Sequence, residues 1–341
     1  MPHLEEEQYM EENIKVEKTD KANPISLVLK GMAMGMAEVV PGVSGGTIAL
    51  ITGIYKELIG TITAFNLSLI GIFKEDGVQG LWKAINGNFL VFLLGGMLLG
   101  IGIGVVGISY LLDLFPEPLW GFFFGLILAS VVYVFRRISK IKWLEIVLFI
   151  MGTLFAYAIT TINPGVGNTN LIFVFFCGTI AISALILPGI SGSFILLLLG
   201  MYTVIVPGLR KLLTDFDSET FIIITVFALG CLTGLLIFSR VLSYIFKRFP
   251  DPTFAILSGF MLGSLNKIWP WRHPTMLLKK EGGIQIPIKD LSSYQTSEHF
   301  KVIQEHNVLP AEYYSSPRTL LVVGAFLFGM LLVYLLSRIE D

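Results

Sequence analysis

Two short segments rich in Pro, Gly and Ser interrupt the apolar runs of this chain, and they restrict its fold more than any other feature. Residues 39–46 read VVPGVSGG, and residues 186–193, which lie 147 positions later, read ILPGISGS. At the same offset, residues 53–55 read GIY and residues 200–202 read GMY. Pro lacks a backbone N–H donor and Gly allows sharp turns, so each segment is expected to break a helix.

The apolar segments on either side of the two breaks are too short to cross a bilayer comfortably. They are Ile25–Val40, Gly46–Ile62, Asn170–Leu187 and Phe194–Val206. As helices they would be about 24, 26, 27 and 20 Å long, whereas the hydrocarbon core is about 30 Å thick. This pattern predicts two re-entrant helical hairpins, 25–62 and 170–206, which turn inside the bilayer and leave on the side they entered. The alternative is two ordinary helix pairs joined by tight turns.

The composition indicates that these segments lie in a membrane. Of the 341 residues, 54% are hydrophobic and only 14% are charged, whereas soluble domains carry about 25% charged residues. The net charge of −1 provides no basic excess for nucleic-acid binding, which excludes that class of protein. The remaining apolar runs predict membrane spans at Phe89–Leu112, Leu119–Phe135, Trp143–Ile162, Phe221–Phe246, Phe254–Trp269 and Leu320–Leu336.

A second pair of matching segments indicates that the chain is a repeat. Residues 115–118 read FPEP and residues 249–252 read FPDP, and each precedes a Gly-containing apolar run. We therefore expect an all-α polytopic membrane protein with two repeats, 24–162 and 163–338, each with one hairpin and three transmembrane helices. Because three crossings is an odd number, the second repeat starts on the opposite face and the repeats are inverted, as in many secondary transporters. The competing interpretation is chance similarity between two Gly-rich apolar stretches.

The placement of Lys and Arg predicts the orientation of the chain. The short loop Arg136–Lys142 carries four basic residues and is expected in the cytoplasm, whereas Phe115–Pro118 and Asn163–Asn170 carry none and are expected outside. Both termini then lie in the cytoplasm and the polar loop 270–317 lies outside. Residues 1–23 hold seven acids and three lysines. They lack the basic start and apolar core of a signal peptide, so they are expected to form an acidic cytoplasmic tail.

The two hairpin tips carry groups that can bind an anion. A backbone break inside hydrocarbon leaves N–H groups that need a partner, and the helix after each break presents the positive end of its dipole. Two opposed helix N-termini with hydroxyl groups favour a phosphate site. The predicted phosphate-binding residues are Ser44, Gly45, Gly46 and Thr47 at the first tip and Ser191, Gly192 and Ser193 at the second. The alternative is that Gly and Ser only allow close helix packing.

Ionisable residues inside a membrane are costly and suggest a function. Arg240 lies within a predicted span and is a further candidate for phosphate binding, because its planar fork fits phosphate oxygens. Glu38 lies just before the first break, and its counterpart in the repeat is Leu185. It is a candidate for proton coupling or for an ion pair with Arg240. Arg136 and Arg137 either guide the headgroup to the cytoplasmic opening or only fix the topology.

The sequence predicts neither a metal site nor a cofactor. Cys177 and Cys231 stand in apolar runs, where Cys behaves as a small buried hydrophobic residue. No Cys and His spacing matches a metal site, and the four histidines lie in polar segments.

The residues around both breaks resemble the polyprenyl-phosphate transporter family called PopT. Residues 35–47, GMAEVVPGVSGGT, and residues 187–193, LPGISGS, carry this resemblance, which covers nearly the whole chain after the tail. The resemblance implies a lipid flippase and not an enzyme. Such a flippase returns undecaprenyl phosphate from the outer to the inner leaflet of the bacterial cytoplasmic membrane for cell-wall synthesis. The implied partners are this lipid and the bilayer, with a homo-oligomer left open.

Two other functions are weighed against this one. Integral-membrane polyprenyl-diphosphate phosphatases share the Pro-Gly-x-Ser motif, but they follow Ser with Arg and carry several glutamates. Gly45 and Gly192 stand in place of that Arg, and Glu38 is alone, so stabilisation of phosphoryl transfer is missing. A small-anion exporter or ion channel is the third class, although the chain has no repeated charged ring for a cation pore. The energy source is open between protons, sodium and downhill movement.

Overall fold

The computed structural model describes residues 23–40, 42–165, 167–214, 217–279, 285–288 and 300–340. The first half of the chain forms α2 (Pro24–Val39), α3 (Gly45–Ile51), α4 (Tyr55–Thr63), α5 (Ser68–Ala84), α6 (Gly87–Leu114), α7 (Pro116–Phe135) and α8 (Trp143–Thr161). The second half forms α9 (Leu171–Ile186), α10 (Gly192–Leu198), α11 (Tyr202–Thr214), α12 (Ser218–Arg248), α13 (Pro250–Ser264), η1 (Leu265–Ile268), β1 (Arg272–Lys279), β2 (Gln285–Pro287), β3 (Phe300–Asn307), η3 (Pro310–Glu312) and α14 (Thr319–Glu340). The predicted acidic tail, up to residue 22, and Pro41 lie outside the described residues.

Within the described ranges, five helices are long and apolar enough to cross a membrane: α6, α7, α8, α12 and α14. The number rises to as many as seven if each of two bent helix pairs forms one span. The predicted span Phe254–Trp269 is mostly α13, a helix of only 15 residues, continued by the short 3-10 turn η1. The chain is therefore a mostly helical membrane protein.

The expectation of an all-α protein is wrong in the loop 270–317. This loop contains a three-stranded antiparallel sheet in the order β2-β1-β3. The pairing of β1 with β3 places Arg272 opposite Asn307 and is irregular next to Pro274. A Pro inside a strand removes a hydrogen-bond donor and argues against a strand at the level of sequence. Tertiary pairing overrides that local signal here.

Each expected hairpin breaks twice, which is once more than the sequence suggested. The predicted helix Gly46–Ile62 divides into α3 and α4, and Phe194–Val206 divides into α10 and α11. At these second breaks, Gly53 has φ 72° and Gly200 has φ 73°. Gly adopts this left-handed backbone without the steric penalty that a Cβ causes. The axes of α10 and α11 consequently differ by 108°.

The elements around the two breaks coincide at the sequence offset of 147. The helices α2 and α9 each have 16 residues, and α3 and α10 each have 7 residues. In each pair, both the first and the last residues are separated by that offset. At the breaks themselves, Gly42 has φ 91° and Gly189 has φ 84°. The two segments therefore share local backbone conformation as well as a motif.

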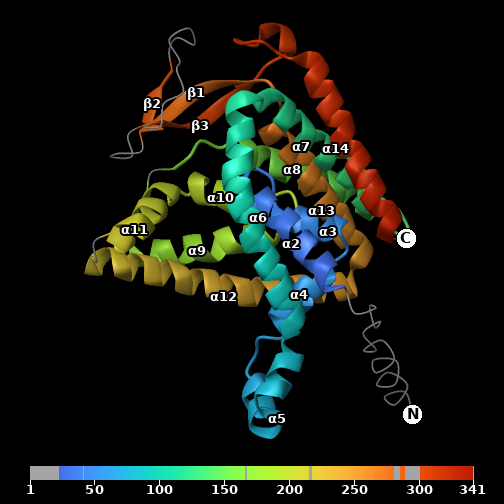
Figure 1. Cartoon of the computed structure of the whole chain (residues 1–341), viewed down its shortest axis with the longest axis vertical. Coiled ribbons are helices and arrows are strands. Elements are labelled where there is room, and N and C mark those ends of the chain that lie inside the picture. Colours follow the sequence, from blue (N-terminus) through green and yellow to red (C-terminus); the bar gives the residue numbers. More distant parts are fainter. Residues whose placement is uncertain are drawn as a thin grey trace.

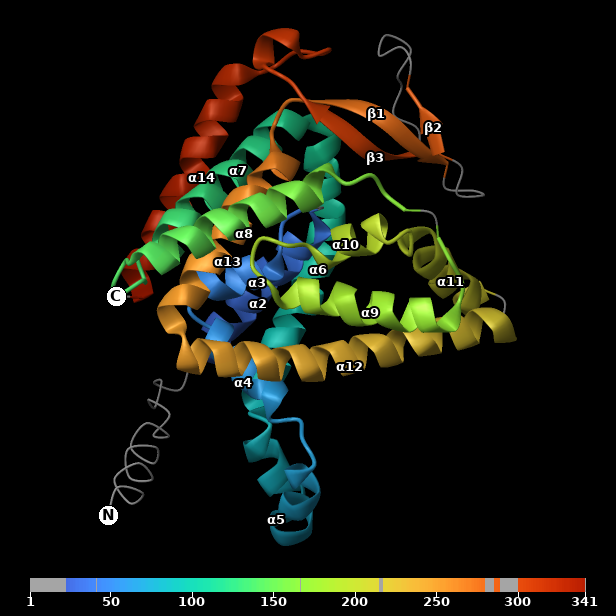
Figure 2. The same ribbon diagram turned by 180° about the vertical axis from the view of Figure 1, so that it is seen from behind.

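Four helix pairs form the packed body of the molecule: α2 with α6, α9 with α12, α7 with α14, and α8 with α13 (Figures 1 and 2). Glycines line each of these contacts. A Cβ added at Gly100 of α6 would collide with the Met32 carbonyl of α2, and one at Gly230 of α12 would collide with the Phe175 carbonyl of α9. Glycine at such positions lets helix backbones approach closely in a membrane. Much of the glycine content therefore serves helix packing.

The acidic residues of the two Phe-Pro-acid-Pro segments occupy corresponding places. Glu117 of α7 accepts a hydrogen bond from Tyr313 Oη at 3.0 Å, just before α14. Asp251 of α13 accepts one from Ser139 N at 2.9 Å, just before α8, and this backbone donor lowers the pKa of Asp251. The helix α7 packs on α14, and α13 packs on α8. Each acid therefore forms a hydrogen bond with the segment that precedes the helix packed against its own.

The helix α5 was not expected from the sequence. Figures 1 and 2 show it at one end of the molecule, opposite the sheet and apart from the packed helices. It has no buried residue, and its backbone is not helical at Gly77, where φ is 62°. Its charged residues lower its hydropathy, so its sequence does not form an apolar run.

Candidate functional site

The two Pro-Gly-x-Ser-Gly tips contact each other at the centre of the molecule. Ser44 Oγ, in the first tip, donates a hydrogen bond to the Leu187 carbonyl in the second tip at 3.2 Å. In the other direction, Gly189 N donates to Thr47 Oγ1 at 3.0 Å. Both hydroxyl residues are fully buried, with 0% of their surface exposed. The structure therefore brings together two motifs that are 147 positions apart in the sequence.

The contact between the tips is close enough to require glycine. A Cβ added at Gly46 would lie 2.6 Å from the Ile186 carbonyl oxygen, closer than van der Waals contact allows. The same carbonyl accepts a hydrogen bond from Tyr55 Oη at 2.9 Å. Tyr55 is the Tyr that follows the motif at the repeated offset, so this residue also belongs to the joint between the tips.

The first tip satisfies its own helix N-terminus. Gly45 N donates to Glu38 Oε1 at 2.7 Å, and Gly46 N donates to Ser44 Oγ at 3.1 Å. A carboxylate and a hydroxyl thus already occupy the start of α3, the place where the sequence predicts an anion. Glu38 binds this backbone donor, and its expected ion pair with Arg240 is not among the contacts of the described residues.

The second tip is arranged differently. Ser191 Oγ and Ser193 Oγ lie 2.9 Å apart and share a hydrogen bond, and the side chain of Ser191, the N-cap residue of α10, makes no capping hydrogen bond. A small hollow runs beside this tip and is lined by Gly42, Gly189, Ser191 and Lys267, among others. Ser193 is half-buried, whereas its counterpart Gly46 is fully covered.

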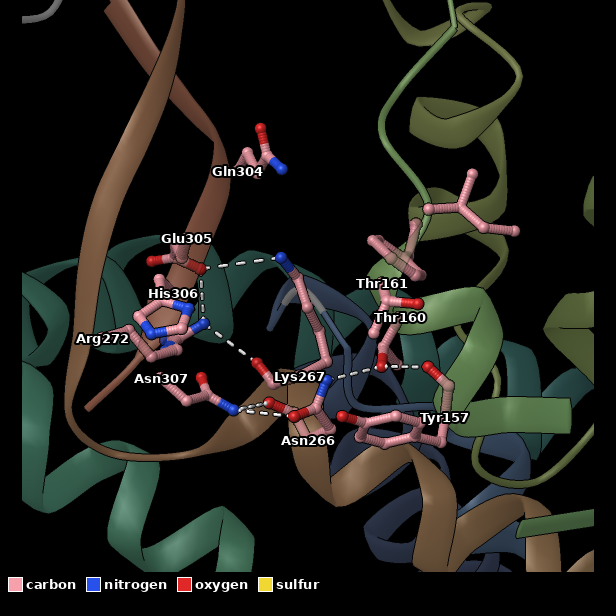
Figure 3. Close-up of a pocket in the computed structure, with 12 residues that line it drawn as sticks. Tyr157, Thr160, Thr161, Asn266, Lys267, Arg272, Gln304, Glu305, His306 and Asn307 are labelled. Carbon is pink, nitrogen blue, oxygen red and sulfur yellow. Dashed lines mark hydrogen bonds and ion pairs between the residues drawn. The ribbon is translucent and has the colours of Figure 1, made fainter. Parts of the chain in front are cut away.

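A larger polar cavity of about 430 Å³ opens next to this hollow (Figure 3). Its walls are the end of α8, the start of α10, the turn η1 and the strands β1 and β3. Thr160, Phe194 and Lys267 line both the cavity and the hollow beside the second tip. The cavity and the hollow beside the second tip therefore share part of their walls.

The floor of the cavity is a hydrogen-bonded polar network. Asn266 Nδ2 donates to Thr160 Oγ1 at 2.7 Å, and Asn307 Nδ2 donates to Asn266 Oδ1 at 2.8 Å. The network connects η1 with α8 and with the end of β3 (Figure 3). The strands β1 and β3 of the small sheet therefore form one wall of the cavity.

Three predicted cationic residues lie elsewhere. The guanidinium of Arg240 on α12 is exposed and donates to the backbone carbonyls of Leu236 at 2.8 Å and Phe65 at 2.7 Å. Arg136 and Arg137 stand at the end of α7, and Arg137 lies over the ring of Tyr133. None of the three lines the cavity or the hollow beside the second tip.

Sequence reasoning missed Lys267, Arg272 and Glu305, which carry the charges of the cavity wall. Lys267 lies inside the predicted span Phe254–Trp269, and an ionisable residue in a span is itself a signal of function. Arg272 and Glu305 belong to the polar loop 270–317, where no sequence motif indicates a site. In the part of the chain that the structure describes, no three His, Cys, Asp or Glu side chains are grouped to hold a metal ion.

The fold and the site together define a polytopic helical membrane protein in which a polar cavity lies next to two joined helix breaks. The chain belongs to the undecaprenyl phosphate translocase-like family, whose family model matches residues 34–286. This membership confirms the resemblance that the two motifs carry.

Two curated relatives are similar to most of the chain. A polyprenyl-phosphate transporter of Vibrio cholerae is 45% identical over 275 residues, which cover 80% of this chain and 87% of that protein. A polyprenyl-phosphate transporter of Staphylococcus aureus is 36% identical over 256 residues, which cover 71% of this chain and 85% of that protein. No solved structure matches the chain.

Proposed function

We propose that this protein carries polyprenyl phosphate, in particular undecaprenyl phosphate, from the outer to the inner leaflet of the bacterial cytoplasmic membrane. The names of both relatives support this substrate. The observation that carries the proposal is the polar cavity, which shares Thr160, Phe194 and Lys267 with the hollow beside the second tip. A lipid phosphate needs such a polar path for its headgroup only, because burying a charge in hydrocarbon is costly.

One side of the cavity is suited to the lipid tail. Tyr157 and Ile162, at the end of α8, line the cavity, yet they are 50% and 55% exposed. Their apolar surface faces outward, where the acyl chains of the bilayer would contact it. The headgroup can then enter beside these residues while the tail stays in the membrane.

We further propose that the two halves, 24–162 and 163–338, are inverted repeats. The matching bounds of α2 with α9 and of α3 with α10, and the matching backbone at the glycines, support this. The segments 25–62 and 170–206 then form re-entrant hairpins whose tips meet near the midplane. With three crossings in each half and the basic loop 136–142 in the cytoplasm, both termini would lie in the cytoplasm and the loop 270–317 would lie outside.

The difference between the two tips suggests the order in which they bind the phosphate. The second tip, with Ser191, Gly192 and Ser193, adjoins the cavity, and it would receive the phosphate from the outer leaflet. The first tip, with Ser44, Gly45, Gly46 and Thr47, is closed by Glu38 and by the second tip. Separation of the tips would free these first-tip groups toward the cytoplasm. Alternation between the two repeats is a general mode of transport in inverted-repeat proteins.

The ionisable residues outside the cavity take secondary roles in this proposal. Glu38 would compete with the phosphate for Gly45 N and is the candidate for proton coupling. Arg136, Arg137 and Arg240 would attract the headgroup on the cytoplasmic side after it leaves the tips. No cofactor is required, since movement of the lipid involves no covalent step.

The test is a transport assay with purified protein in liposomes. Labelled undecaprenyl phosphate in the outer leaflet should reach the inner leaflet faster than in empty liposomes. Undecaprenol, which lacks the phosphate, should show no protein-dependent movement. Equal movement of undecaprenyl phosphate with and without the protein would contradict the proposal.

Two further arms separate the alternative functions. Release of phosphate from undecaprenyl diphosphate would favour the phosphatase, and uptake of free inorganic phosphate would favour the small-anion exporter. We expect neither. The positions after the two tip serines are Gly45 and Gly192 and provide no cation to stabilise phosphoryl transfer.

A further inference from the structure

Three charged side chains meet in the wall of the polar cavity. Lys267 Nζ lies 3.6 Å from Glu305 Oε2, and Arg272 Nη1 lies 2.6 Å from the same oxygen (Figure 3). They come from η1, β1 and β3, so the sheet brings them together. Both cations of this cluster therefore share one carboxylate oxygen.

The cluster is shielded from solvent, which makes its charge balance important. The side chains of Arg272, Lys267 and Glu305 are 7%, 17% and 22% exposed. Charges with little hydration need partners, because their desolvation is costly. Arg272 Nε is buried and has no hydrogen-bond partner among the described residues. Glu305 is therefore the counter-ion that holds both cations of this poorly hydrated cluster.

Packing fixes the positions of the two cations. The guanidinium of Arg272 lies 4.1 Å from the ring centre of Trp120, and its Nη1 also donates to the Lys267 carbonyl at 2.9 Å. Lys267 Nζ lies 5.2 Å from the ring centre of Phe194, at the start of α10. The stem of Lys267 runs past Gly42, so this side chain reaches from the first break to the cavity.

We propose that Glu305 is a resident counter-ion that occupies the place of a phosphate monoester between Lys267 and Arg272, and that the arriving headgroup displaces it. This inference rests on the proposed function and assigns the outer headgroup site to these residues. A phosphate monoester carries about −1.5 to −2 charges at pH 7 and three acceptor oxygens, so it satisfies two cations better than one carboxylate does. Arg in particular matches phosphate geometry.

The exchange keeps the two cations paired at every stage. Without lipid, Glu305 neutralises one of the two positive charges, so neither cation is left alone in a poorly hydrated site. With lipid, the carboxylate can turn toward the cavity, which is open to water near His306. Competition from Glu305 also limits how tightly the headgroup is held, which suits a protein that must release it.

The test measures binding of a short-chain lipid phosphate to purified full-length protein in detergent. Farnesyl phosphate is the probe, inorganic phosphate and farnesol are competitors, and the variants are Glu305→Gln and Lys267→Gln. The control is Asp217→Asn, which removes a carboxylate from the Lys211–Asp217 pair, 3.0 Å apart and away from the cavity. The unfolding temperature of each variant is measured in parallel.

We expect Glu305→Gln to bind farnesyl phosphate about fivefold to tenfold more tightly, because the competing negative charge is gone. We expect Lys267→Gln to bind it about tenfold more weakly, because hydrogen bonds between charged groups are the stronger ones. Asp217→Asn should bind like the wild type. Competition by inorganic phosphate alone, with an affinity equal to that of the lipid, would assign the site to the free ion. Weaker competition by inorganic phosphate and none by farnesol would assign it to the lipid headgroup.

Unchanged or weaker binding by folded Glu305→Gln would overturn the inference and leave Glu305 as a fastener of the sheet. If that variant does not fold, Lys267→Gln decides, and unchanged binding by it overturns the inference. Transport of undecaprenyl phosphate by the wild type separates the two proposals. If the wild type transports the lipid but both variants bind farnesyl phosphate with the wild-type affinity, the counter-ion role of Glu305 is rejected and the proposed function stands.

Discussion

Thr47 Oγ1 accepts a hydrogen bond from Gly189 N at 3.0 Å, and this bond joins the two hairpin tips across 142 positions of sequence. Thr47 is completely buried, and its counterpart in the second half is Phe194, which lines the cavity instead. The two tips are therefore alike in backbone but different in the groups they present. That difference distinguishes a closed first tip from a second tip beside the cavity.

The substitution Thr47→Val should destabilise the joint between the tips. Val has a similar shape but cannot accept the hydrogen bond, so Gly189 N is left buried without a partner, at a cost of about 1–3 kcal/mol. Thermal unfolding in detergent measures the effect. Thr63→Val is the control, because the Thr63 hydroxyl is exposed and bonds only within its own helix. Equal unfolding temperatures for the two variants would show that the bond between the tips contributes nothing.

The glycines of α6 should divide into two groups when replaced by Ala. Gly100 faces the Met32 carbonyl of α2, whereas Gly102 has open space around it. We expect Gly100→Ala to force α2 and α6 apart and to destabilise the protein by about 1–3 kcal/mol. Gly102→Ala should be neutral or slightly stabilising, since Ala is the better helix former. The free energy of unfolding in mixed detergent would show the difference, and equal values would contradict the packing.

Replacing Arg240 by Ala should leave lipid binding unchanged. Its guanidinium donates to the carbonyls of Leu236 and Phe65 and does not line the cavity. Arg240→Ala should therefore bind farnesyl phosphate within about twofold of the wild type, while the contact between α12 and the end of α4 weakens. A large loss of affinity would instead assign Arg240 to the phosphate site.

Cysteine labelling tests the proposed inverted topology. In a background with Cys177 and Cys231 replaced by Ala, Asn168→Cys should react with a membrane-impermeant thiol reagent from outside the cell. Lys140→Cys should react only after the membrane is opened. Both positions are exposed in the structure, so lack of reaction cannot come from burial. Reaction of both from the same side would contradict inverted repeats with this orientation.

The helix breaks and most spans could be predicted because their causes are local. Pro and Gly interrupt a helix whatever surrounds them, and the predicted break at residues 186–193 matches the end of α9 and the start of α10. The second breaks at Gly53 and Gly200 have a weaker local signal, a Gly and a Tyr repeated at the same spacing in both halves, without a Pro. A glycine φ near 70° depends on the chain that folds back beside it.

The cavity could not be predicted in the same way. Arg272 and Glu305 contact each other because β1 pairs with β3, and the hydropathy pattern of the chain does not predict that pairing. Lys267 was visible as a charge within an apolar run, so it could have been singled out with Glu38 and Arg240. The charged residues around Lys267 include Arg272 and Glu305, which are 33 positions apart and meet through strand pairing. A local sequence pattern does not encode such a contact.

Transport through the joined tips is tested by comparing Ser191→Leu with Ser183→Leu in liposomes that contain equal amounts of inserted protein. Ser191 is buried and lines the hollow beside the second tip, whereas Ser183 lies on α9 of the same hairpin and donates to the Thr179 carbonyl of its own helix. We expect labelled undecaprenyl phosphate to cross with the wild type and with Ser183→Leu, and to move with Ser191→Leu no faster than in empty liposomes. Transport by Ser191→Leu at the wild-type rate would contradict a headgroup path along the tips.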